Sequence, residues 1–137
     1  MNNVAKILDI PINILNLPEA INLVKNVINA NKKLHIITVN AEIIMLSLRD
    51  KEFKDILINS DLNIADGSGI VWALRRKNIK INKLAGIELV ENCIKHLKNA
   101  RIFLLGAEED VISRAFKNLN DKYKNNNLVG YRNGFFF

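Results

Sequence analysis

Residues 62–76 read LNIADGSGIVWALRR, and this stretch decides which fold the chain is expected to adopt. The short apolar run LNIA (62–65) has the character of a buried strand, and the helical pattern GIVWALRRK (69–77) begins only a few residues later. A buried strand that leads through a glycine turn into a helix is typical of α/β proteins with a parallel sheet. The stretch therefore predicts one strand and one helix of such a sheet.

Asp66 stands between this strand and this helix, and it has two interpretations. In the first, Asp-Gly is a common turn pair, the two nearby glycines tolerate positive φ, and Ser68 caps the helix. In the second, Asp66 is an active-site carboxylate at the end of a strand, beside a glycine loop that lets a substrate approach the backbone. The local residues favour the turn, because turn aspartates far outnumber catalytic ones.

The segments on either side of this stretch continue the alternation of strands and helices. The predicted strands are two short ones joined by a turn over 4–15, three further ones over 34–40, 62–65 and 101–106, and one at the start of 128–137. The predicted helices lie over 18–33, starting at Pro18, and over 69–77, 86–100 and 108–123. Two more helices are expected within 41–60, separated near Arg49 and Asp50. We therefore expect a Rossmann-like α/β fold, with a mostly parallel sheet, helices on both faces and a short N-terminal strand pair. A single domain over residues 1–137 is the simplest organisation for this length.

The amino-acid composition is consistent with a globular α/β domain, and the net charge indicates which class of partner the protein binds. Hydrophobic residues make up 49% of the 137 residues and charged residues 25%, which is typical of a globular protein. The net charge of +6 favours anionic partners, namely phosphorylated ligands, lipid headgroups or nucleic acid. The single cysteine, Cys93, excludes an internal disulfide and lies in a helical pattern, where we interpret it as a packing residue.

The sequence also predicts where the protein resides. Asp9 and Pro11 interrupt the apolar residues near the N-terminus, so no signal peptide is expected. No stretch approaches the roughly 20 uninterrupted apolar residues that a spanning helix needs. We therefore expect a cytoplasmic protein whose contact with a membrane is peripheral.

Polar residues follow the predicted strands at the edge where α/β proteins bind ligands, outside the carboxyl ends of the strands. If the strands are neighbours, a hydroxyl, an amide, a carboxylate and two glycine turns meet there. Simpler explanations exist, since Asn40 can cap the following helix, Thr38 can be an ordinary strand residue and Gly106 can permit a tight turn. The candidate residues at this edge are Thr38, Asn40, Asp66, Gly67, Ser68, Gly69, Gly106 and Ala107.

Known cofactor and metal motifs are missing. GSGIVWA lacks the third glycine of a dinucleotide fingerprint, and nothing matches the phosphate-binding loop GxxxxGK[ST]. The two histidines, His35 and His96, are isolated, so we expect neither a cofactor nor a metal site. A pairing of serine with histidine and aspartate, or of cysteine with histidine, is not evident from the order of residues.

Basic residues form two local groups, one over 75–83 and one at Lys122 and Lys124. They are either solvated helix ends or counter-charges for a diphosphate or an anionic lipid. Aromatic residues are not interleaved among them, so we expect no nucleic-acid partner. A nucleic-acid-binding domain stays as a weaker hypothesis that rests on net charge alone.

Four blocks of sequence, taken in order, resemble the bacterial WecG/TagA/CpsF glycosyltransferases. The blocks are TVNAEIIMLSLRDKEFKDILINSDLNIADGSGIVWALR, KLAGIELVENCIKHL, RIFLLGAEEDVISRAFKNLNDKY and LVGYRNGFF. The resemblance covers nearly the whole chain from about Lys33 onward. It is carried above all by the threonine–x–asparagine segment that precedes an aspartate–glycine turn.

The resemblance implies an inverting glycosyltransferase. Its donor would be a UDP-sugar, typically UDP-N-acetylmannosamine, and its acceptor N-acetylglucosamine linked to polyprenyl diphosphate, in teichoic acid or cell-surface polysaccharide synthesis. Asp66 matches the family aspartate that acts as general base, and Thr38 and Asn40 match a polar pair beside the substrates. Such an enzyme would work in the cytoplasm at the inner face of the cell membrane. The resemblance extends the substrate-binding set to Gly67, Ser68, Gly69, Lys83, Gly86, Gly106 and Ala107.

The chain departs from the family in two respects. In the segment KLAG (83–86), Lys83 stands where the family usually has an arginine. Lysine keeps the positive charge but lacks the planar guanidinium group of arginine. The family also continues beyond GYRNGFFF with further strands and a basic C-terminal appendage associated with membrane docking. We therefore expect a chain that is C-terminally truncated relative to the family. The alternative function is a non-catalytic module that binds a nucleotide sugar or a partner.

The apolar end of the chain carries a further expectation. Residues 135–137 are three phenylalanines. If their side chains were exposed, they would form a hydrophobic surface patch that promotes association. They either dock on the sheet or belong to the front part of a longer protein. An incomplete sheet with such a tail also favours self-association, so we expect a homo-oligomer.

Overall fold

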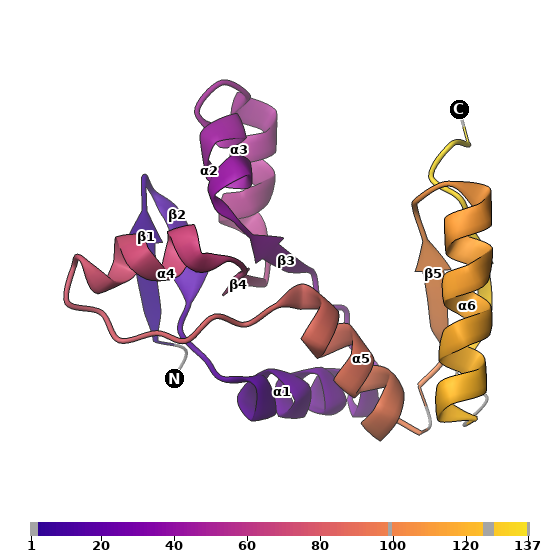
Figure 1. Ribbon diagram of the computed structural model, residues 1–137. Coiled ribbons are helices and arrows are strands. Elements are labelled where there is room, and N and C mark those ends of the chain that lie inside the picture. Colours follow the sequence, from indigo (N-terminus) through magenta and orange to yellow (C-terminus); the bar gives the residue numbers. More distant parts are fainter. Residues whose placement is uncertain (1–2, 99, 125–127, 137) are drawn as a thin grey trace. The chain divides into compact units, whose positions relative to one another are not determined.

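The computed structural model describes residues 3–98, 100–124 and 128–136 (Figure 1). The chain divides into two compact units, Met1–Val90 and Glu91–Phe137, and the division falls within helix α5 (Gly86–His96). Each unit has a sheet of its own. The expectation of a single domain over residues 1–137 stays a prediction.

The first unit is built on a four-stranded sheet with the order β1-β2-β4-β3. β1 (Val4–Ile7) and β2 (Ile10–Asn13) form the predicted antiparallel pair, and β4 (Leu62–Ala65) runs parallel to both of its neighbours, β2 and β3 (Ile36–Val39). β4 is the central parallel strand, and all four of its residues are buried. The residue that follows it therefore emerges from the middle of the sheet edge.

Helices cover both faces of this sheet, as predicted. Successive side chains of a strand point to opposite faces, so the register partners Val39 and Ala65 share one face while Thr38 and Ile64 share the other. The first face packs against α2 (Ala41–Ser47), α3 (Lys51–Asn59) and α4 (Ser68–Arg75) in one apolar core. The buried members of this core are Ala5, Ile7, Ile10, Ile12, Val39, Ile44, Leu57, Ala65, Ile70, Val71, Leu74 and Ile81.

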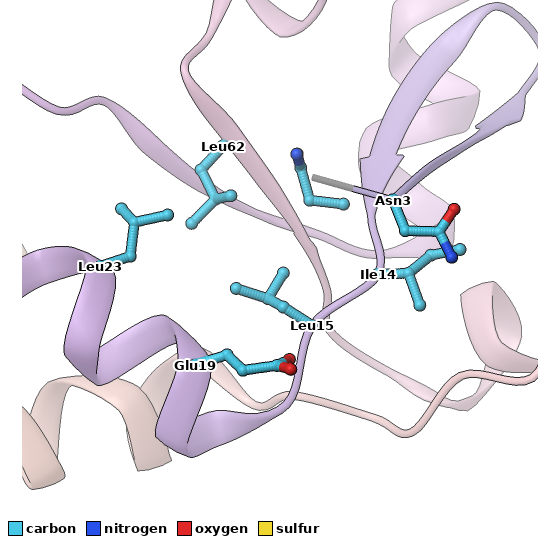
Figure 2. A pocket seen from close by; sticks show the side chains of 7 residues that line it. Asn3, Ile14, Leu15, Glu19, Leu23 and Leu62 are labelled. Carbon is cyan, nitrogen blue, oxygen red and sulfur yellow. The ribbon is translucent and has the colours of Figure 1, made fainter. Parts of the chain in front are cut away.

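The opposite face receives α1 (Leu17–Asn29). Figure 2 shows Leu23 of α1 and Leu62 of β4 pointing into the same hollow, whose lining also includes Leu15. α1 begins with a capping box, because Asn16 accepts a hydrogen bond from the Glu19 N–H while the Glu19 carboxylate accepts one from the Asn16 N–H. The α/β fold with a mostly parallel sheet is thus confirmed.

The predicted break within residues 41–60 has a clear local cause. Asp50 is the N-cap of α3, and its carboxylate accepts a hydrogen bond from the Phe53 N–H at 2.9 Å. An N-cap residue has extended backbone angles, so the helix before it cannot run through this position. α2 accordingly ends at Ser47, and α3 starts at Lys51.

A buried asparagine ties the sheet to α3. Asn63 is 1% exposed, its amide group donates to the Leu57 carbonyl at 2.7 Å, and its amide oxygen accepts from the Ser60 hydroxyl at 3.0 Å. Its backbone N–H donates to the Asn13 side chain at 2.8 Å. A buried polar group is tolerated only when its hydrogen bonds are made, so these contacts fix β4 against β2 and the end of α3.

The second unit has the same strand–helix–strand pattern. β5 (Ile102–Leu105) and β6 (Leu128–Arg132) are parallel, and α6 (Glu109–Tyr123) connects them. The rings of Phe116 and Tyr131 pack with centroids 5.1 Å apart. Phe135 is 75% exposed, so this ring does not dock on the sheet of this unit, as one of the two alternatives for the tail expected. Phe136 lies against the Arg132 guanidinium, and Phe137 lies outside the described residues.

Three ionisable groups of the second unit have shifted pKa values, and one of them is Lys122, whose pKa is raised by its hydrogen bond to Glu91. The Lys122 ammonium bonds to the Glu91 carboxylate and holds the pKa of Glu91 below its usual range, and the Tyr123 hydroxyl acts in the same direction. Burial raises the pKa of the Cys93 thiol. A raised pKa lowers the fraction of nucleophilic thiolate, so Cys93 has the properties of a packing residue.

Candidate functional site

Three segments that are far apart in the sequence meet at the carboxyl edge of β3 and β4. The Asp66 N–H donates to the Val39 carbonyl at 2.9 Å, which joins the end of β4 to the end of β3. The Gly86 N–H, the first of α5, donates to Asp66 Oδ2 at 3.2 Å. The Leu84 N–H donates to the Ala65 carbonyl at 2.8 Å and fixes the segment that delivers Gly86.

The contact between Gly86 and Thr38 is too close for any side chain at residue 86. A Cβ atom there would overlap with Thr38 Cγ2 and lie 3.2 Å from Thr38 Cβ and 3.5 Å from Asp66 Oδ2. Thr38, Asp66 and Gly86 therefore lie close together at one point of the sheet edge. Glycine is required at residue 86 because of this close approach, and not because of a positive φ.

The arrangement gives Asp66 the properties of an oriented base. Asp66 and Thr38 are both partly exposed, so a ligand can reach them. The hydrogen bond from the start of α5 holds Oδ2, and the other carboxylate oxygen has no hydrogen-bond partner among the described residues. A carboxylate held in this way can accept a proton from a hydroxyl group at hydrogen-bond distance.

Asn40 is the N-cap of α2, as one of its two interpretations predicted. Its side-chain oxygen accepts a hydrogen bond from the Ile43 N–H at 2.9 Å. Asn40 also borders the glycine turn, because a Cβ at Gly67 would lie 3.8 Å from Asn40 Cβ. Its amide NH₂ group has no partner within the part of the chain that the structure describes, so a ligand role for that group stays a prediction.

The two roles of Asn40 can be separated by substitution. Asn40→Ala removes the cap and should destabilise the first unit by about 1 kcal/mol. Asn40→Asp keeps an oxygen acceptor and should leave the stability close to that of the wild type, while it loses the NH₂ donor. Urea denaturation of the three proteins measures this difference. If Asn40→Asp is as unstable as Asn40→Ala, the cap is not what Asn40 contributes.

The glycine turn after Asp66 differs in one detail from the interpretation in which Ser68 caps the helix. Gly67, with φ +103°, is the N-cap residue of α4, and no side chain caps this helix. Ser68 is the first helical residue and not the cap, so its hydroxyl is exposed at the start of α4. Gly69 packs against Ala41, because a Cβ there would lie 3.2 Å from Ala41 Cβ.

A groove of about 560 Å³ extends from this turn along α4. It is lined by Ser68, Val71, Trp72, Arg75, Arg76 and Lys83. Lys83 is exposed and places its charge near Ser68 in the same groove. The structure thus brings two of the predicted substrate-binding residues, Ser68 and Lys83, into one groove, whose lining does not include Asp66.

Gly106 and Ala107 belong to the second unit and are explained there by a turn. Gly106 has φ +125° and donates its N–H to the Arg132 carbonyl at 3.0 Å. The Ala107 carbonyl accepts from the Gly134 N–H at 2.9 Å. The reading of Gly106 as a residue that permits a tight turn is supported, and a substrate role for Gly106 and Ala107 stays a prediction.

The hollow in Figure 2 is separate from this site. It has a volume of about 210 Å³ and is bordered by Leu62, the first residue of β4, whereas Asp66 follows the last residue of that strand. Its acidic residue, Glu19, is already occupied by the capping box of α1. The hollow therefore offers no chemistry of its own.

Metal ligands do not gather anywhere in residues 3–98, 100–124 and 128–136, since no three His, Cys, Asp or Glu side chains come together there. Over these same residues, no helix combines the length and the apolar character that crossing a membrane requires.

The fold and the site define an α/β protein with a carboxylate, a hydroxyl and a glycine turn at the carboxyl edge of its parallel strands. The glycosyl transferase WecG/TagA/CpsF family matches residues 5–137 of the chain. The chain belongs to this family, which confirms the resemblance seen in the sequence.

Two curated relatives of this chain, from different bacteria, share one descriptive name. The chain is 32% identical over 101 residues to the N-acetylglucosaminyldiphosphoundecaprenol N-acetyl-beta-D-mannosaminyltransferase of Bacillus subtilis (strain 168), covering 72% of this chain and 40% of the relative. It is 31% identical over 99 residues to the protein of the same name from Staphylococcus aureus (strain NCTC 8325 / PS 47), covering 70% of this chain and 39% of the relative. The chain thus spans about two fifths of the length of the relatives that it matches.

Sequence reasoning missed two residues of the groove, Val71 and, with more consequence, Trp72. Its ring lies 5.3 Å from the Arg76 guanidinium, because residues four apart on a helix are neighbours. The signal was in the sequence, because the helix expected over 69–77 places Trp72 and Arg76 four residues apart.

Proposed function

We propose that the chain is the part of a glycosyltransferase that carries the catalytic base, Asp66. The observation that carries this proposal is the meeting of Thr38, Asp66 and Gly86 at one point of the sheet edge. The donor is a UDP-sugar, with N-acetylmannosamine as the transferred sugar, and the acceptor is N-acetylglucosamine on polyprenyl diphosphate. The descriptive name that both relatives share supports this sugar and this acceptor.

The proposed reaction needs one proton transfer and one displacement. An acceptor hydroxyl lies against Asp66, and its oxygen attacks the anomeric carbon of the donor sugar as its proton passes to the carboxylate. The bond between the anomeric carbon and the diphosphate oxygen breaks, and its electron pair leaves with UDP. Attack from the face opposite the leaving group inverts the anomeric carbon.

The leaving diphosphate develops negative charge that the site must stabilise. Lys83 and Ser68 line the groove along α4, the helix that follows Asp66 and Gly67, and would supply an ammonium group and a hydroxyl donor. Lysine acts as a point charge and lacks the bidentate geometry of arginine. Thr38 and Asn40 would donate hydrogen bonds to the sugars.

A second candidate function rests on the groove along α4, which Ser68 and Lys83 line and Asp66 does not. In this alternative the chain holds a nucleotide sugar without transferring it. Either function would operate at the inner face of the cell membrane, in the synthesis of a cell-surface polysaccharide or teichoic acid.

Two measurements on the same protein separate these functions. Calorimetric titration with UDP-N-acetylmannosamine measures binding, and incubation with a synthetic N-acetylglucosamine-diphosphoprenol measures transfer. Binding together with a disaccharide product supports the transferase, and binding without product supports the binding module. If neither binding nor product is observed, both proposals are wrong.

A further inference from the structure

The exposed face of α4 carries the single tryptophan of the chain beside two arginines. Trp72 is 63% exposed, although tryptophan is a residue that proteins usually cover. The Arg76 guanidinium lies 5.3 Å from the centroid of the Trp72 ring. Arg75 is also exposed, and its guanidinium donates to the Ile81 carbonyl at 3.4 Å. We call Trp72, Arg75 and Arg76 the α4 surface.

Acidic residues do not balance the positive charge of this part of the chain. From Gly67 to Ala85 the sequence holds five basic residues and no aspartate or glutamate. The ion pairs found among the described residues involve Lys54, Arg114 and Lys122, and none of them lies in this segment. The charge is therefore available to an anionic partner.

The α4 surface combines this charge with an apolar groove. Trp72, Arg75 and Arg76 line the groove of about 560 Å³ together with Val71. Tryptophan prefers the boundary between water and lipid, because its ring is apolar and its N–H is polar. Arginine next to it can bond lipid phosphates while its stem stays on the apolar side.

We propose that the α4 surface is the contact of this protein with an anionic phospholipid bilayer. Arg75 and Arg76 bind headgroup phosphates, and Trp72 lies at the level of the headgroups. Because α4 starts immediately after Asp66 and Gly67, Trp72, Arg75 and Arg76 lie about 6–12 Å along the helix from Ser68. The proposal does not depend on sugar transfer, and it would place the edge of the sheet next to any lipid-anchored substrate.

Tryptophan fluorescence tests the proposal without a label, because Trp72 is the only tryptophan. The protein is titrated with vesicles of phosphatidylglycerol and phosphatidylcholine in equal amounts, and with vesicles of phosphatidylcholine alone. We expect the emission of Trp72 to shift to shorter wavelength with the anionic vesicles only, and to be quenched by lipids brominated on their acyl chains. Raising the salt concentration should weaken the binding.

The matched variants change the net charge by the same amount at two places. Arg75→Gln/Arg76→Gln should weaken vesicle binding about 25-fold, which is about fivefold for each basic residue. Lys32→Gln/Lys33→Gln, at exposed positions beyond the end of α1, should weaken it much less. Arg76→Gln alone keeps the Arg75–Ile81 hydrogen bond and should still cost about fivefold.

Several outcomes would overturn the proposal. Equal losses in the two double variants would show that net charge alone drives binding. Vesicle binding without a shift or quenching of Trp72 would place the contact elsewhere. Binding of inorganic diphosphate that is lost in Arg75→Gln/Arg76→Gln, without any response to vesicles, would assign the α4 surface to a free phosphate ligand. Oligonucleotide binding that needs Arg75 and Arg76, without any response to vesicles, would assign the surface to nucleic acid.

Discussion

Asp66→Asn is expected to reduce sugar transfer by about 10²–10⁴-fold, the range that removal of a positioned general base produces. Asparagine has nearly the same shape and keeps an oxygen that can accept the Gly86 N–H, so the sheet edge should remain intact. The donor does not need the proton acceptor for binding, and its affinity should change little. A fall in turnover with unchanged donor affinity is therefore the expected result.

The chain spans about two fifths of its relatives, so turnover is best measured in a chimera as well. Residues 5–137 would replace the corresponding segment of the Bacillus subtilis relative, and the wild-type chimera sets the reference rate. Asp55→Asn makes the same chemical change at an exposed position on α3 and serves as the matched control. Full turnover in Asp66→Asn would show that another group takes the proton.

Among substitutions in the site that add one methyl group, Gly86→Ala is expected to cause the largest loss of stability and of transfer rate. The new Cβ would overlap with Thr38 Cγ2 and lie 3.5 Å from Asp66 Oδ2. Relief requires a shift of α5 or of Thr38, and overpacking of this kind costs about 1–3 kcal/mol in stability. A displacement near 1 Å at a catalytic site can also reduce the rate by about 10²-fold.

A second substitution tests whether this clash is the cause. Thr38→Ser removes Cγ2, which is the atom that overlaps most, and keeps the hydroxyl. Thr38→Ser/Gly86→Ala should therefore regain a large part of the stability that Gly86→Ala loses, as measured by urea denaturation. If the two substitutions are merely additive, the close approach of Thr38 and Gly86 is not what limits residue 86.

The fold was predictable because its signals are local. Asp50 and Pro18 mark helix starts, and the apolar run 62–65 predicts a strand that is buried on both faces. The boundaries differ by a few residues where a cap or a left-handed residue ends an element. The helix expected over 18–33, for example, ends at Asn29, shortly before Asn31 with φ +51°.

The site was predictable only in part, because its residues meet through tertiary contacts. Thr38 and Asp66 could be placed at one sheet edge from the strand pattern, since parallel neighbours end at the same side. The hydrogen bond from Gly86 to Asp66 joins residues that are 20 positions apart and has no local signal. The dual position of Asn40, as a helix cap and as a neighbour of Gly67, likewise became visible only in three dimensions.

The most direct test of the central claim is an amide NMR titration of the ¹⁵N-labelled chain with UDP-N-acetylmannosamine. We expect the largest shift changes at Thr38 and Gly86, which lie near the Asp66 carboxylate, and at Asn40 and Gly67, which lie against each other at the same sheet edge. Shift changes confined to other residues, such as Leu23 and Leu62 around the hollow in Figure 2, would contradict the assignment of this sheet edge as the sugar-binding site.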